Sequence, residues 1–94
     1  MEYKLTSQFM KDAKSFDDDS EFVHLLAVKV KHITKVASME DIDGLVPIRK
    51  TTTNYRFKIK TNKSTYRVGI KRIKKIIWLA CIDNNKKRFY KRFP

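Results

Sequence analysis

The central part of the N-terminal half carries a helical pattern of apolar residues. After an acidic run at residues 17–19, apolar side chains recur every three or four positions, the spacing of one helix face. This stripe consists of Phe22, Leu26, Val30, Ile33 and Ala37. Asp18 and Glu21 have capping-box spacing, and acidic residues stabilise a helix N-terminus. The pattern predicts a helix that ends near Ser38.

A short strand and a shorter helix are predicted before it. Residues 2–6 alternate between polar and apolar side chains and are expected to form the strand. Ser7 is the expected N-cap of a helix that runs to Phe16. Phe9, Ala13 and Phe16 lie at i, i+4 and i+7 in this helix and share one face.

The spacing of apolar residues changes from helical to alternating in the second half. Aromatic and branched residues alternate there with lysine and arginine, which is typical of strands. Strands are predicted over residues 55–60, 66–71 and 75–82, with a connector at 39–50 and turns at 61–64 and 72–75. The last strand is almost entirely apolar, so both of its faces are expected to be covered.

These elements predict one α+β domain that spans residues 1–94. Two N-terminal helices are expected to pack on a four-stranded antiparallel sheet, in the order β-α-α-β-β-β. Three consecutive strands with short turns favour a meander, and the helices would then cover one of its faces.

Charge is divided unequally between the two halves of the chain. Residues 1–48 hold 6 Lys/Arg and 9 Asp/Glu, net −3, whereas residues 49–94 hold 16 Lys/Arg and a single acid, Asp83, net +15. The basic residues are interleaved with aromatic and branched residues, so they belong to folded strands rather than to a disordered tail. A folded sheet with this charge is expected to bind a polyanion, and nucleic acid is the leading candidate.

Composition excludes several other classes. A single cysteine, Cys81, permits neither an intramolecular disulfide nor a zinc site made of several thiolates. No secretory signal is recognisable, and the longest apolar run, residues 76–82, is too short to span a bilayer. A cytoplasmic protein without a membrane partner is therefore expected.

The alternation predicts a basic surface on one face of the sheet. If the apolar residues of the first long strand face the helices, Arg56, Lys58 and Lys60 share the opposite face. Arg67 and Lys71 of the next strand are expected beside them, around an open backbone at Gly69. The basic segment 86–92, which contains Tyr90, is expected at the edge of this surface, where the tyrosine can stack on an unpaired base.

This surface has some of the chemistry that RNA cleavage needs. Attack by the 2′-hydroxyl requires a base, an acid and positive charge near the phosphorus. Both histidines, His24 and His32, lie on the predicted second helix, and Asp83 alone cannot form a two-metal site. Neighbouring cations disfavour a protonated lysine, so Lys58 is the strongest candidate for a general base. No metal or other cofactor is expected.

Three segments of the basic half together resemble the RelE/ParE superfamily of bacterial type II toxins. They are Tyr-Arg-Phe-Lys-Ile at 55–59, Tyr-Arg-Val-Gly-Ile at 66–70, and the closing Lys-Lys-Arg-Phe-Tyr-Lys-Arg-Phe-Pro at 86–94. The resemblance implies a small α+β toxin with a RelE-like fold and a cognate antitoxin partner. In the RelE branch, the toxin enters the ribosome, contacts 16S rRNA and cleaves bound mRNA without a metal ion.

The resemblance also implies roles for five residues. Arg56 and Lys58 stand where family members contact phosphate, one of them as general base. Arg67 stands where an arginine stabilises the transition state. Lys86 stands where an arginine is a general acid or phosphate ligand, and Tyr90 where a tyrosine stacks on a base or assists proton transfer. Further RNA contacts are expected from Lys60, Lys71, Lys87, Arg88, Lys91 and Arg92.

The chain departs from the family pattern at two adjacent positions. Asn85 stands where many members of the RelE branch carry histidine, and Lys86 replaces an arginine. Asparagine does not shuttle protons near neutral pH, and lysine lacks the planar fork of arginine. Two alternatives to the ribonuclease therefore stay open: a ParE-like inhibitor of DNA gyrase, and an RNA- or ribosome-binding member with impaired catalysis.

Overall fold

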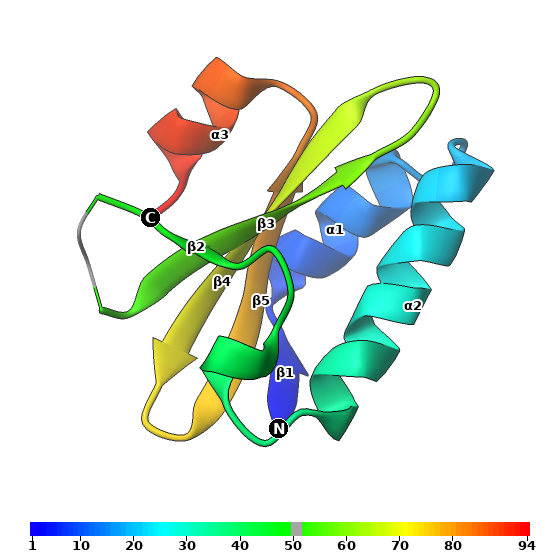
Figure 1. Cartoon of the computed structure of the whole chain (residues 1–94). Helices are drawn as coiled ribbons and strands as arrows, with labels where there is room; N and C mark the ends of the chain where they lie inside the picture. The colour runs from blue at the N-terminus through cyan, green and yellow to red at the C-terminus, as the bar shows by residue number, and fades with distance from the viewer. Residues whose placement is uncertain (50–51) are drawn as a thin grey trace.

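The computed structural model describes residues 1–49 and 52–94, which form an α+β structure as predicted. In chain order the elements are β1 (Tyr3–Leu5), α1 (Ser7–Ser15), α2 (Ser20–Lys35), the 3-10 helix η1 (Met39–Asp41), β2 (Val46–Pro47), β3 (Asn54–Lys60), β4 (Thr65–Ile73), β5 (Ile76–Asp83) and α3 (Lys86–Arg92). Helices α1 and α2 cover one face of the sheet, and α3 lies on the other (Figure 1). The predicted connector included Lys50, which lies outside the described residues.

The sheet of the described residues has five strands, in the order β1-β5-β4-β3-β2. Strands β3, β4 and β5 form the predicted antiparallel meander. The prediction of four strands, all antiparallel, is wrong in two respects. Strand β1 pairs with β5 in parallel, since α1 and α2 carry the chain across one face and the meander returns beside β1 in the same direction. The two-residue strand β2 adds a fifth strand against β3.

Side-chain caps fix where the two long helices begin. The Thr6 side chain accepts a hydrogen bond from the backbone N–H of Phe9, so Thr6 is the N-cap of α1 rather than Ser7. Asp19 plays the same part for α2, accepting from the N–H of Phe22 at 3.2 Å. Helix α2 ends at Lys35, three residues before the predicted end.

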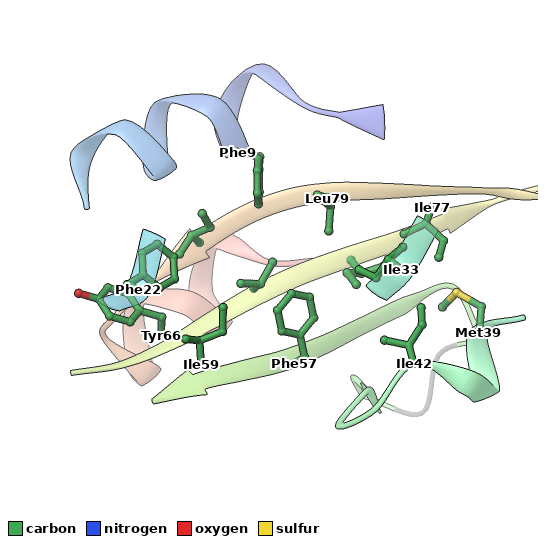
Figure 2. Close-up of a cluster of buried hydrophobic side chains, with 13 residues drawn as sticks. Phe9, Phe22, Ile33, Met39, Ile42, Phe57, Ile59, Tyr66, Ile77 and Leu79 are labelled. Atoms are coloured by element: carbon green, nitrogen blue, oxygen red, sulfur yellow. The ribbon is translucent and has the colours of Figure 1, made fainter. Parts of the chain in front are cut away.

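The main hydrophobic core lies between the sheet and helices α1 and α2 (Figure 2). Phe9 enters it from α1, and Phe22 and Ile33 enter it from α2. Phe57 and Ile59 of β3 are buried against them, as the alternation of that strand predicted. This burial leaves the intervening side chains of β3 on the opposite face.

A bulge in the pairing of β4 with β5 places residues of β5 in both hydrophobic cores. The pairing of β4 with β5 shifts between Gly69 and Ile70, so that Gly69 lies opposite Cys81 and Ile70 lies opposite Leu79. As a result, Leu79 and Ile82 both join the main core, whereas Cys81 joins a second core under α3. The prediction that both faces of this strand are covered holds only in part, because Ile76, Trp78 and Ala80 stay partly exposed.

Helix α3 was not predicted, and the expectation of two helices is wrong. Asn85 caps it by accepting from the N–H of Arg88 at 2.8 Å. Phe89 and Phe93 lie four residues apart, pack together and form the second core with Ile48 and Cys81. The segment is helical because this spacing lets both rings contact the sheet, while its basic residues remain outward.

Candidate functional site

Helix α3 is seated over the centre of the basic face by a close contact at Gly69. A Cβ atom at Gly69 would stand 2.8 Å from the Phe93 ring, so only glycine lets the ring lie this close to β4. The expectation that the backbone is open at Gly69 is therefore wrong, because Phe93 covers it. The seated helix carries Tyr90 to the edge of the basic face.

Four of the five residues expected to act in catalysis come together beside α3. Lys58 lies directly across from Arg67 in the β3–β4 pairing, and Arg56 lies across from Gly69. The Arg56 Nε donates a hydrogen bond to the Tyr90 hydroxyl oxygen at 3.1 Å. The Arg67 guanidinium carbon lies 6.0 Å from the centroid of the Tyr90 ring. We call Arg56, Lys58, Arg67 and Tyr90 the cationic cluster.

Arg67 is the most deeply placed cation of this cluster. Its exposed fraction is 9%, and its Nε has no hydrogen-bond partner among residues 1–49 and 52–94. Asp83 lies across from it in the β4–β5 pairing, but this carboxylate binds Arg88 and Arg92 instead. A buried guanidinium group without a carboxylate partner is poorly compensated, which favours binding of an anion at this point.

The crowding of cations changes two proton affinities. The charge of Arg56, and then that of Arg67, lowers the pKa of Lys58, with smaller contributions from lost hydration and Lys60. Burial tends to raise the pKa of the Tyr90 hydroxyl, but hydrogen bonds and charge from Arg56 and Arg67 outweigh it and lower that pKa. Both groups are thus easier to deprotonate than free lysine and free tyrosine.

Two of the arginines expected to contact RNA are held in ion pairs. Arg88 contacts the Asp83 carboxylate at 2.7 Å, and Arg92 contacts the same carboxylate at 2.8 Å. Arg92 also reaches Asp12 of α1 at 2.9 Å. Burial tends to raise the pKa of Asp83, but the hydrogen bonds from both arginines outweigh it and lower that pKa. These arginines fix α3 to the sheet, and part of their charge is compensated.

Lys86 and Asn85 stand apart from the cluster. Lys86 is the first residue of α3 and is exposed, and its side chain has no hydrogen bond or ion pair within the described part of the chain. Asn85 uses its side-chain oxygen as a helix cap. The position where the family pattern has histidine therefore has a structural role in this chain.

The other predicted RNA contacts are spread over the surface. The exposed ones are Lys60, Lys71, Lys87 and Lys91. Lys71 lies two positions beyond Gly69 on β4, in a hollow that it shares with Phe93 and Trp78, so Phe93 separates it from Arg67. His24 and His32 both lie on α2, away from the cationic cluster, as expected.

One contact to this site was not expected from the sequence. Arg49 donates from Nη2 to the backbone carbonyl of Tyr90 at 2.6 Å, which ties the β2–β3 connection to α3. Its backbone has a φ of 52°, in the left-handed region, so this residue is held in an uncommon conformation. No periodic pattern in residues 39–50 indicated such a contact.

No protein-family model matches the chain, and no curated protein or solved structure matches it significantly. Across residues 1–49 and 52–94, no three His, Cys, Asp or Glu side chains are grouped closely enough to hold a metal ion. None of the helices in the described residues combines the length and apolar character needed to cross a membrane.

Proposed function

We propose that this protein is the toxin of a type II toxin–antitoxin system, a RelE-like endoribonuclease that cleaves mRNA on the ribosome. The observation that carries the proposal is the buried Arg67 guanidinium, which has no carboxylate partner among the described residues and lies beside Tyr90 and opposite Lys58. An RNA phosphate is the anion that fits a lysine of lowered pKa, an arginine and a tyrosine in one place. Its inhibitor would be a cognate antitoxin protein.

The proposed reaction needs three groups of the cluster. Neutral Lys58 takes the proton of the 2′-hydroxyl, and the freed oxygen forms a bond to the adjacent phosphorus. Arg67 neutralises the negative charge that develops on the phosphate oxygens. The bond from phosphorus to the 5′-oxygen breaks, and Tyr90 donates a proton to that oxygen. The products are a 2′,3′-cyclic phosphate and a 5′-hydroxyl end.

A specific observation favours a second candidate, an RNA- or ribosome-binding protein with impaired catalysis. Asn85 is a helix cap and Lys86 points to solvent without a contact to the cluster, so neither completes the acid side of the reaction. Tyr90 would then be the sole acid of the cluster. Such a protein would still bind an RNA phosphate at the cluster but would cleave RNA slowly.

Mapping of mRNA 5′ ends after induction of the protein separates the candidates. Codon-phased cuts within translated regions support the ribonuclease. Intact transcripts together with growth arrest and ribosome association support the impaired member. Intact transcripts with arrested DNA gyrase would instead show the ParE-like activity and contradict both proposals.

Two substitutions test the assignment of the cluster. We expect Lys58→Ala and Arg67→Ala to abolish cleavage while circular dichroism spectra stay unchanged. Lys75→Ala removes the same charge from the turn between β4 and β5, and it should cleave like the unmodified protein. Unimpaired cleavage by Lys58→Ala and Arg67→Ala would show that the active residues lie elsewhere.

A further inference from the structure

A groove lies between α2 and the edge of β3 and reaches Lys58. Its volume is about 430 Å³, which lies within the range of small-molecule sites. Lys58 and Lys60 line it from β3, and Val28, Lys29 and His32 line it from α2. Lys58 lines the groove at the edge of β3 and also belongs to the cluster, so the two sites meet at this edge although they open on opposite faces of the sheet.

The groove is accessible because the edge of β3 is left partly uncovered. Strand β2 pairs only with Tyr55 and Arg56. Beyond Arg56, no strand of the described residues pairs with this edge of β3, which runs on to Lys60. A ligand that lies over Lys58 can therefore extend past the edge into the groove without displacing a strand.

The far wall of the groove is fixed by contacts from α2 to the following loop. The Lys29 ammonium donates to the carbonyl oxygen of Asp43 and lies 5.2 Å from the centroid of the Phe57 ring. His32 Nε2 lies 3.2 Å from the carbonyl oxygen of Asp41. These two residues are held in place, whereas Lys58 and Lys60 have no side-chain hydrogen bond or ion pair in residues 1–49 and 52–94.

The groove combines an apolar surface with the free charge of Lys60, and its one acidic lining residue in the described part of the chain, Asp43, acts on Lys29. Val28 has an exposed fraction of 52% although it is apolar, and Ile59 of β3 lies on the floor. A nucleobase packs well on such a surface, and the phosphate of its nucleotide matches the charge of Lys60. An acidic peptide would satisfy the lysines but would leave the apolar wall without a matching group.

We propose that this groove is a subsite for one nucleotide of a single-stranded RNA, next to the phosphate held by the cationic cluster. The base lies against Val28 and Ile59, and its phosphate contacts Lys60. This inference rests on the proposed function, because it takes the RNA at the cluster as its starting point. It adds a base contact outside the cluster, whose groups in the proposed reaction act on the phosphate and the 2′-hydroxyl.

Fluorescence anisotropy with a labelled 2′-O-methyl hexanucleotide tests the subsite, because this RNA binds but has no 2′-hydroxyl to react. Val28→Glu should weaken binding about tenfold, the loss expected when one base contact is removed. Val23→Glu is the matched control: Val23 is also an exposed valine of α2 but lines a different hollow. Val23→Glu adds the same charge as Val28→Glu but outside the groove. It should therefore bind within about twofold of the unmodified protein.

Hexanucleotides with a single abasic position identify the base. One abasic position should weaken binding by the unmodified protein as much as Val28→Glu does, and Val28→Glu should then cause no further loss. The subsite is overturned if Val28→Glu binds the intact RNA normally, or if its loss is the same at every abasic position. It is also overturned if Val28→Glu weakens binding of an oligoglutamate peptide and leaves RNA binding unchanged.

The same measurement distinguishes failure of the subsite from failure of the proposed function. If the unmodified protein binds the hexanucleotide and Arg67→Ala does not, the cluster stands whatever Val28→Glu does. If the unmodified protein binds no RNA, both the subsite and the proposed function are wrong.

Discussion

The contact between Gly69 and Phe93 allows a sharp test of how α3 is held on the sheet. In Gly69→Ala, the new Cβ would lie 2.8 Å from one ring carbon of Phe93 and 2.9 Å from another. Ordinary carbon contacts are about 3.5–4.0 Å, so the ring must move by roughly 0.7–1.2 Å. Phe93 is 5% exposed, and its neighbour Phe89 is fully buried, so little space is free for this movement.

The cost follows from two opposing contributions. Overpacking of this size typically destabilises by about 1–3 kcal/mol. Replacing glycine by alanine in a strand gains about 0.5–1 kcal/mol, because the unfolded chain loses conformational freedom. Gly69 is not in the left-handed region, so backbone strain adds nothing. We expect Gly69→Ala to lower the free energy of unfolding by about 1–2 kcal/mol.

Urea denaturation of a double-mutant cycle measures this cost. In a Phe93→Ala background the ring is gone, so Gly69→Ala should be neutral or slightly stabilising. Gly44→Ala is a contrasting control: Gly44 has a φ of 75°, and a Cβ added there would meet no atom within 4 Å, so its cost is backbone strain alone. Equal effects of Gly69→Ala in both backgrounds would show that the Phe93 ring does not set the position of α3.

Three further predictions concern the caps, the buried carboxylate and the candidate base. Thr6→Ala removes the α1 cap and a 2.7 Å bond to the Ala80 carbonyl and should cost about 1–2 kcal/mol in urea denaturation, whereas Thr6→Ser should restore most of it. Asp83→Asn should cost about 3 kcal/mol at neutral pH. The folded-state pKa of Asp83 is lowered, so its contribution to the free energy of unfolding is complete above the ordinary value of 3.8. That contribution is lost as the pH falls towards the folded pKa. Asp83→Asn should therefore flatten the fall in stability at acid pH. If Lys58 is the base, cleavage should accelerate with rising pH, and Arg56→Gln should shift that rise to higher pH; an unshifted profile would contradict the role of Lys58.

The periodicity of apolar residues was sufficient to predict the long helices and strands. It did not predict the pairing of β1 with β5 or the short helix α3. The alternation around Phe57 and the helical stripe around Phe22 each reflect burial against one layer, and burial leaves a regular pattern in the sequence. The pairing of β1 with β5 leaves no such pattern, because a three-residue strand is too short to specify a partner. Helix α3 was missed because its basic residues outnumber its apolar ones, although the cap at Asn85 and the Phe89–Phe93 spacing were visible signals.

At the candidate site, too, features set by neighbouring residues were predictable, and contacts between residues far apart in the chain were not. Alternation along two strands predicted that Arg56, Lys58 and Arg67 share a face, since strand geometry alone fixes that result. It did not predict that Arg92 is held in ion pairs, because one of its partners, Asp12, is 80 residues away in the chain. Charge counted along the sequence therefore overstated the charge that is free to bind a polyanion.

Arg92 links layers that the sheet would otherwise keep apart. Its guanidinium group contacts Asp83 at the end of β5 and Asp12 on α1. This one side chain of α3 therefore connects α3 to α1, although the two helices lie on opposite faces of the sheet. Asp12 also accepts from the N–H of Ile82, where the short strand β1 no longer covers the edge of β5. Local opening of either helix breaks contacts of the other, so their amide protons should exchange with solvent as one cooperative unit. The position of Tyr90 on the basic face is thereby made sensitive to the order of the first helix of the chain.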